Sequence, residues 1–167
     1  MGRSHTSDDV FEFEDDDGAA DAFVDIAFRA RAEDARWIPS PRASQKKALH
    51  KDQPLFRHVA RRFFLVDGER AHGRCAAFVN PRLKDQAGNP YGQIGMYEVD
   101  GPSVGRRLIE RALAWLSERG CQAVLAPMNG STWHSYRFVD DWKEMSPLLL
   151  EPNTPVSYAS AFRELRF

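Results

Sequence analysis

The sequence has little cysteine and no long apolar run. Its 167 residues include only two cysteines, Cys75 and Cys121. Neither has metal-site spacing to the other or to a histidine, so we expect both to be small buried apolar side chains. No apolar stretch approaches membrane-spanning length, and the polar start, Met1 to Asp9, is unlike a signal peptide. We therefore expect a cytoplasmic protein without stable membrane insertion.

An excess of charge of either sign is also absent. The chain has 23 lysines and arginines against 24 aspartates and glutamates, so no net field favours nucleic acid as a partner. No phosphate loop, nucleophile elbow or metal-ligand spacing occurs, and we expect no metal. The 43% of apolar residues is enough for one core. We expect a single domain over residues 10–167 behind a flexible segment at 1–9.

The first third of the chain predicts helices. A short acidic strand over 10–13 is followed by apolar residues at helical spacing, which predict a helix over 19–35. The prolines in "WIPSP" at 37–41 end that helix, because proline and the residue before it leave the helical region. Two further short helices are expected, over 44–50 and 55–59.

The pattern then changes to that of strands. Apolar runs at 62–66 and 73–79 flank Asp67-Gly68, a dipeptide typical of a hairpin. A polar loop over 80–89 leads to a third strand at 91–99. The next helix has an apolar stripe and stops at Gly120. The apolar segment 123–126 predicts a strand buried on both faces, and the strand–helix–strand order makes it parallel to the strand at 91–99.

The element order and three segments resemble the GNAT superfamily of acyl-CoA-dependent N-acyltransferases. The segments are the one beginning "DARWIPSPR", "GMYE" with "RALAWLSERG", and "APMNGST". The resemblance covers about residues 10–167 and is to a bacterial branch of mostly unassigned substrate, with some relatives linked to acylation of long-chain amines. It implies an α/β (α+β) fold with a mixed, mostly antiparallel central sheet and flanking helices. Two strands that usually follow the fourth helix would be missing after "NTPVSYASAFRELRF".

This resemblance implies a coenzyme A site, with acetyl-CoA or another acyl-CoA as donor and a small-molecule amine, apolar or long-chain, as acceptor. In the superfamily, the central strand binds the pantetheine arm and the next helix start binds the diphosphate. Two arginines at a helix start suit such an anion. The implied cofactor-binding residues are Met96, Tyr97, Val99, Gly101, Ser103, Val104, Gly105, Arg106, Arg107 and Asn129.

The helix start departs from the family loop, Gln/Arg-x-x-Gly-x-Gly/Ala. In "DGPSVG" only the final glycine, Gly105, matches, and Asp100 stands at the position of the cation or amide. Two alternatives therefore remain. One is a catalytically weak or inactive GNAT-like binding or scaffold subunit, whose sheet a second copy or a partner subunit completes. The other is an acyltransferase with a carrier-bound or aminoacylated donor.

Glu98 and Tyr158 are the candidate catalytic residues. Glu98 lies near the end of the strand, where burial would raise its pKa into the range of a general base; the alternative is a strand glutamate paired with a basic side chain. By the resemblance, Tyr158 matches a tyrosine acid on the fourth helix; the alternative is a core aromatic. Tyr97 alternates with Glu98, so only one of them faces the site.

The segment after the last strand combines polar and aromatic residues. Asn129 and Ser131 lie at the carboxyl end of a parallel strand, where ligands commonly bind; ordinary turn chemistry is the alternative. Aromatic residues then predict a loop or lid suited to an apolar acceptor or an interface. These aromatic residues are Trp133, Tyr136, Phe138 and Trp142.

Overall fold

A five-stranded sheet forms the centre of the molecule. The computed structural model describes residues 9–69, 71–141 and 153–165, so most of the expected flexible N-terminus lies outside them. Strands follow one another in sequence order, and all neighbours are antiparallel except the parallel β4 and β5. This confirms the predicted mixed, mostly antiparallel sheet. The strands are β1 (Phe11–Phe13), β2 (Ala60–Asp67), β3 (His72–Lys84), β4 (Pro90–Val99) and β5 (Ala123–Leu125).

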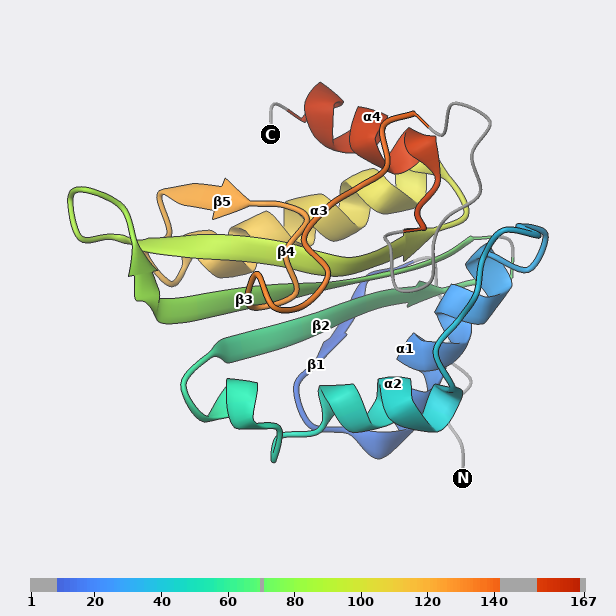
Figure 1. Cartoon of the computed structure of the whole chain (residues 1–167), viewed down its shortest axis with the longest axis horizontal. Helices are drawn as coiled ribbons and strands as arrows, with labels where there is room; N and C mark the ends of the chain where they lie inside the picture. Colours follow the sequence, from blue (N-terminus) through green and yellow to red (C-terminus); the bar gives the residue numbers. More distant parts are fainter. Residues whose placement is uncertain (1–8, 70, 142–152, 166–167) are drawn as a thin grey trace.

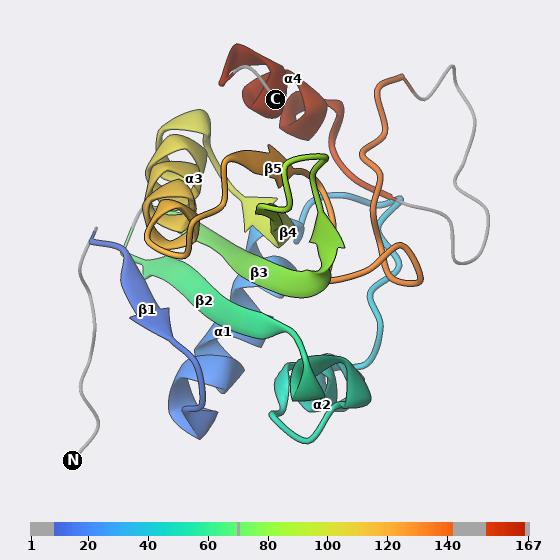
Figure 2. The ribbon, with the colours of Figure 1, turned by 90° about the vertical axis from the view of Figure 1, so that its left-hand side faces the viewer.

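Helices cover both faces of this sheet (Figures 1 and 2). One face carries α1 (Asp17–Ala30), α2 (Arg42–Leu49) and the 3₁₀ helix η1 (Pro54–Arg57). The other carries α3 (Pro102–Ser117) and α4 (Val156–Glu164). The predicted element order is confirmed. Among the described helices, none has the length and apolar character needed to cross a membrane.

All three helices expected before β2 have bounds that differ from the predictions, and α2 begins two residues earlier than expected, at Arg42. α1 begins two residues early because Asp16 caps it, accepting a hydrogen bond from the Ala19 N–H (2.8 Å). It ends at Ala30 because Arg31 leaves the helical conformation and turns its side chain toward Asp34. The third expected helix is only the 3₁₀ turn η1, which opens with Pro54 and stops before Val59.

Two strands also differ. β3 continues through 80–84, which the sequence predicted as loop, because Lys84 still pairs with Pro90 and a tight turn over 85–89 closes the hairpin. Polar side chains are tolerated there because this end of the hairpin extends beyond the core. β5 is not buried on both faces, because Ala123 is exposed and Val124 and Leu125 are only partly buried. It is also an edge strand of the described sheet.

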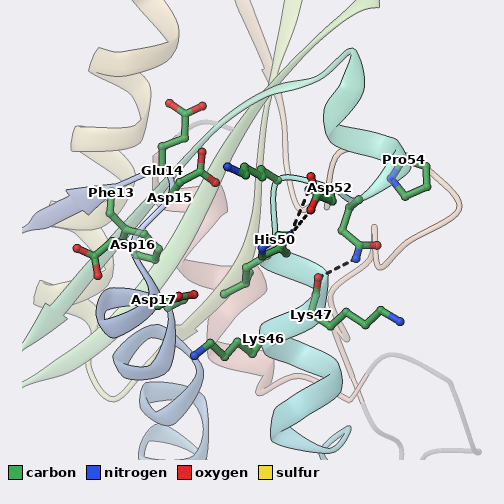
Figure 3. Close-up of a pocket in the computed structure, with 14 residues that line it drawn as sticks. Phe13, Glu14, Asp15, Asp16, Asp17, Lys46, Lys47, His50, Asp52 and Pro54 are labelled. Atoms are coloured by element: carbon green, nitrogen blue, oxygen red, sulfur yellow. Dashed lines mark hydrogen bonds and ion pairs between the residues drawn. The ribbon is translucent and has the colours of Figure 1, made fainter.

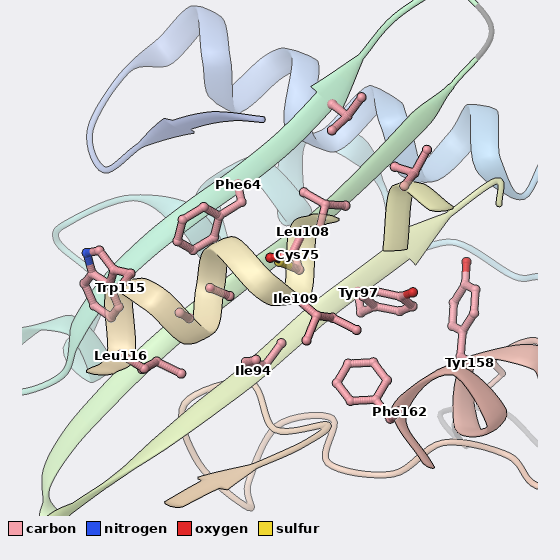
Figure 4. Close-up of a cluster of buried hydrophobic side chains, with 14 of the residues drawn as sticks. Phe64, Cys75, Ile94, Tyr97, Leu108, Ile109, Trp115, Leu116, Tyr158 and Phe162 are labelled. Carbon is pink, nitrogen blue, oxygen red and sulfur yellow. The ribbon is translucent and has the colours of Figure 1, made fainter. Parts of the chain in front are cut away.

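The sheet separates two apolar clusters. Figure 4 shows the cluster beneath α3, in which Phe64, Cys75 and Ile94 of the strands meet the α3 stripe. The opposite cluster joins Phe23 and Ile26 of α1 to the other face of β2 and β3. Cys75 and Cys121 are both buried, as expected. The apolar stripe of α3 comprises Leu108, Ile109, Ala112 and Leu116.

Gly73 allows α3 to lie directly on β3. A Cβ at this glycine would lie 2.6 Å from Val104 Cγ1 and 2.8 Å from Leu108 Cδ1. Gly73→Ala should therefore lower the free energy of unfolding by about 1 to 3 kcal/mol through overpacking. Gly101→Ala, where a Cβ meets no atom within 4 Å, should lower it less, by about 0.5 kcal/mol, because the only cost there is that of alanine at the N-cap of α3. Urea denaturation of the two variants measures this, and equal midpoints would contradict the prediction.

Candidate functional site

β4 separates from its parallel neighbour, β5, about half-way along β4. β5 pairs with it only over Tyr91–Gln93, after which Met128 donates its N–H to the Ile94 carbonyl (2.8 Å). In the ranges that the structure describes, no strand lies on that side of residues 95–99. The backbone groups of this end of β4 therefore need partners from elsewhere.

A β-bulge lies where the two strands separate. Arg74 pairs with Glu98 and Ala76 pairs with Gly95, so β4 holds one more residue than β3 between these pairs. Met96 has a φ of 49°, a conformation that non-glycine residues rarely adopt. Its N–H donates to the Asn129 side-chain oxygen (2.7 Å). The structure thus brings Met96 and Asn129, two of the predicted residues, into direct contact.

Tyr158 of α4 meets Glu98 at the free edge of β4. Its hydroxyl lies 3.0 Å from Glu98 Oε2 and 3.1 Å from the Val99 carbonyl oxygen. The Val99 N–H donates to the same hydroxyl oxygen at 2.9 Å. Because the hydroxyl has one proton, it can donate to only one of the two oxygens at a time. Tyr158 therefore binds the carboxylate and also takes the place of a neighbouring strand.

The surroundings of Glu98 and Tyr158 shift the pKa values of both side chains. Burial raises the pKa of Glu98, and the nearby Arg74 and Arg31 act in the opposite direction. Arg31 Nη1 lies 3.4 Å from Glu98 Oε2, with the arginine side chain only 1% exposed. Burial, followed by the charge of Glu98, raises the pKa of Tyr158, so its hydroxyl keeps its proton at neutral pH. The site thus combines a carboxyl that can accept a proton with a hydroxyl that holds one.

Tyr97 points to the opposite face of the sheet. Its ring is buried against the rings of Tyr158 and Phe162, with centroids 4.9 and 5.0 Å away (Figure 4). The Tyr97 hydroxyl lies so close beneath Gly105 that a Cβ there would collide with it. Of the alternating pair, the side chain of Glu98 therefore faces Tyr158's hydroxyl, and Tyr97 can bind a ligand there only through its backbone.

The start of α3 has no side-chain cap. Gly101 occupies the N-cap position and Pro102 opens the helix. The Asp100 carboxylate instead accepts a hydrogen bond from the His72 N–H (2.7 Å), and the Asp100 N–H donates to the His72 carbonyl (3.1 Å). Asp100 is thus held toward β3, and the helix start remains available for an anion.

The remaining predicted residues of α3 divide between surface and core. Ser103 and Arg106 line a cavity of about 280 Å³ between α3 and α4, together with Glu164 and others. The side chain of Val104 is buried in the core beneath α3, and Arg107 is half-buried. Of these side chains, Ser103 and Arg106 are the exposed ones at the helix start.

After β5, residues 126–141 form an irregular loop, as predicted. The Ser131 hydroxyl lies 2.8 Å from His134 Nδ1, which is ordinary turn chemistry. Trp133 is 94% exposed and Tyr136 is 43% exposed, whereas Phe138 packs on Tyr97 and Phe162. Trp142 lies outside the described residues.

Two buried arginines at the site were not predicted from the sequence. Arg31, just after α1, contacts Glu98, Asp34 and Asn153. Arg74, near the start of β3, donates to the Phe23 carbonyl. The second has a visible signal, because a lone arginine interrupts the apolar run "GRCAAFV". A charged residue at an inward position of a strand indicates a buried partner.

A larger cavity, of about 800 Å³, lies between the β1–α1 turn and α2 (Figure 3). Acidic residues at 14–17 and basic residues at 46–51 line it. Most of these charges have structural partners: Asp16 caps α1, Asp15 binds Arg61 at 2.5 Å, and Lys46 binds Asp21 at 2.8 Å. None of the lining residues takes part in the described contacts of Glu98 or Tyr158, so we place the candidate site at β4.

Asn129→Ala tests the support of the bulge. The substitution removes the partner of the Met96 N–H, and a poorly solvated donor left unpaired should lower the free energy of unfolding by about 1 to 3 kcal/mol. Asn80→Ala is the control, because Asn80 also accepts a backbone N–H, that of Arg82, at an exposed position. It should lower stability by less than about 0.5 kcal/mol. Equal losses in urea denaturation would count against a special role of Asn129.

Two solved structures are similar to this chain. One is an aminoglycoside acetyltransferase from an uncultured soil metagenomic sample in complex with sisomicin, with 18% identity and a TM-score of 0.48, covering 72% of this chain and 77% of that one. The other is an acetyltransferase of Trypanosoma brucei, with 14% identity and a TM-score of 0.47, covering 72% and 84%. No family model and no curated protein matches the sequence. Both neighbours are acetyltransferases.

Proposed function

We propose that this protein is an acyl-CoA-dependent N-acyltransferase that transfers an acyl group from coenzyme A to a small-molecule primary amine. The contact between Glu98 and Tyr158 carries this proposal. A carboxyl group with a raised pKa and a protonated tyrosine lie 3.0 Å apart at the free end of β4. A base and an acid side by side are what direct attack by an amine requires.

Each residue has one task in the reaction. Glu98 takes a proton from the amine, directly or through water, while the new N–C bond forms and the C–S bond of the thioester breaks. Tyr158 gives its proton to the departing sulfur. Backbone N–H groups between Met96 and Glu98 stabilise negative charge on the carbonyl oxygen. No metal enters this scheme.

Features of the start of α3 support the proposal that its backbone amides bind the diphosphate of coenzyme A. No side chain occupies the N-cap, a Cβ at Gly101 would meet open space, and the Asp100 carboxylate is engaged with His72. Arg106 is exposed one turn along the helix and can add a charge-assisted hydrogen bond, with Arg107 as a second cation. Met96, Tyr97 and Val99 would bind the pantetheine arm through their backbone.

A second candidate is a GNAT-like binding subunit, or an enzyme with a carrier-bound or aminoacylated donor. One observation favours these alternatives. The Met96 N–H and the Val99 N–H are already bound by Asn129 and Tyr158, so free coenzyme A has to displace them or use other groups. A second copy or partner chain beside β5 would complete the sheet in the binding-subunit case.

Calorimetric titration with coenzyme A and acetyl-CoA separates these functions. The N-acyltransferase should bind both, and replacing Arg106 and Arg107 by alanine should weaken binding by about 10-fold or more, since each charged hydrogen bond contributes about 1.5 to 3 kcal/mol. Arg119→Ala, in the turn just after the far end of α3, should leave binding unchanged. No binding by folded protein at millimolar ligand would rule out free coenzyme A as donor.

The pH dependence of acyl transfer tests Glu98 as the base. Because burial raises the pKa of Glu98, kcat/KM should rise with pH through a midpoint above 4.5, its ordinary value, and fall at lower pH as the carboxyl is protonated. Glu98→Gln should lower the rate by about 10²- to 10⁴-fold and remove this limb. Tyr158→Phe should lower the rate but keep the limb. A limb that persists in Glu98→Gln would assign the base elsewhere.

A further inference from the structure

Arg74 is a buried cation on the strand next to Glu98. In the register of β3 and β4 it is the direct partner of Glu98. Only 9% of Arg74 is exposed, so its guanidinium is largely removed from water. A buried charge is costly unless a nearby group of opposite charge compensates it.

Among the described residues, the hydrogen-bond partners of Arg74 are neutral. Nη1 donates to the Phe23 carbonyl at 3.0 Å, and Nη2 donates to Gln45 Oε1 at 3.4 Å. The guanidinium carbon lies 4.9 Å from the centre of the Phe23 ring. These contacts from α1 and α2 fix the side chain in place without neutralising it. Among the described residues, Arg74 forms no ion pair within 4.0 Å, and Glu98 is the carboxylate that interacts electrostatically with it.

The other charged neighbours of Glu98 have different roles. Arg31, from the end of α1, donates to Glu98 at 3.4 Å but also to the Asp34 carboxylate at 2.8 Å. Arg31 therefore has a counter-charge of its own. Tyr158 from α4 has a protonated hydroxyl and carries no charge. The same is true of Tyr97, which lies on the same strand as Glu98. Arg74 is thus the cation whose compensation depends on Glu98.

We propose that Arg74 is a positioning residue for Glu98: its guanidinium, held on β3 by contacts with Phe23 and Gln45, keeps the neighbouring carboxylate of β4 ionised beside Tyr158. The role of that carboxylate as a base rests on the proposed function, whereas the electrostatic interaction between the two side chains does not. Burial alone would favour the neutral form of Glu98, and a neutral acid cannot accept a proton from an amine. Arg74 offsets this effect and never has to touch the substrate.

The two side chains depend on each other. Burial lowers the pKa of Arg74, and the charge of Glu98 acts against this shift. Burial raises the pKa of Glu98, and the charge of Arg74 is the largest single effect that acts against it, followed by the charge of Arg31. Loss of the guanidinium should therefore move the titration of Glu98 further upward, because an opposite charge nearby changes a carboxyl pKa by about 1 to 3 units.

Carbon-13 NMR of protein labelled at the glutamate carboxyl groups tests this proposal without requiring activity. The Glu98 signal is identified by its loss in Glu98→Gln, and its titration midpoint is then measured in the full chain. Arg74→Met, which keeps the apolar stem, should raise the midpoint by about 1 unit or more. Arg74→Lys, which keeps the charge, should restore most of the wild-type midpoint. The acid limb of kcat/KM should move with it.

Arg61→Met is the matched control. Arg61 is also a buried strand arginine, 5% exposed, but it pairs with Asp15, so its loss should leave the Glu98 midpoint unchanged. Arg74→Gln serves as a second neutral variant if the methionine variant does not fold. An unchanged midpoint in a folded neutral variant overturns the proposal. A raised midpoint in a protein that transfers no acyl group supports the role of Arg74 and rejects Glu98 as an acyltransferase base.

Discussion

The hydrogen bond from the Met96 N–H to Asn129 holds a left-handed residue at the point where β4 leaves β5. Such a conformation costs a non-glycine residue about 1 to 3 kcal/mol unless its surroundings fix it. The extra residue also sets which side chain faces which layer, because side chains alternate along a strand. Beyond the bulge, Tyr97 enters the core beneath α3, and Glu98 pairs with Arg74. The separation of the strands and the placement of the carboxyl thus have one local cause.

The candidate site also brings together charged and polar side chains from several helices and strands. Glu98 of β4 lies near Arg74 of β3 and Arg31, the residue just after α1, and its carboxylate contacts Tyr158 of α4. Removing one member of such a buried group leaves another without compensation, which costs more than the intact group contributes to stability. This network makes the relative positions of the sheet and three helices interdependent, since α2 also contributes Gln45. The arrangement favours a rigid site rather than a maximally stable core.

Much of the fold could be predicted from local patterns, and the site only in part. Asp67-Gly68 marks the hairpin, and the apolar stripe of α3 marks the crossover that makes β4 and β5 parallel. Met96 gives no such signal, because neither glycine nor asparagine stands there to indicate a left-handed residue. The partnership of Arg74 with Glu98 depends on a register that the bulge shifts. The direction of Asp100 depends on the start of β3, which is distant in sequence.

Tyr158 reaches Glu98 across a separation of 60 residues in the chain. A ribosome makes α1, β3 and β4 long before α4, so the carboxylate and its arginines can come together while the tyrosine is still unmade. Until α4 docks, the N–H and carbonyl of Val99 lack the hydroxyl that binds them in the finished protein. A nascent sheet with such an open edge can pair with other chains. The residue proposed as the acid is therefore also the one that protects this edge at the end of folding.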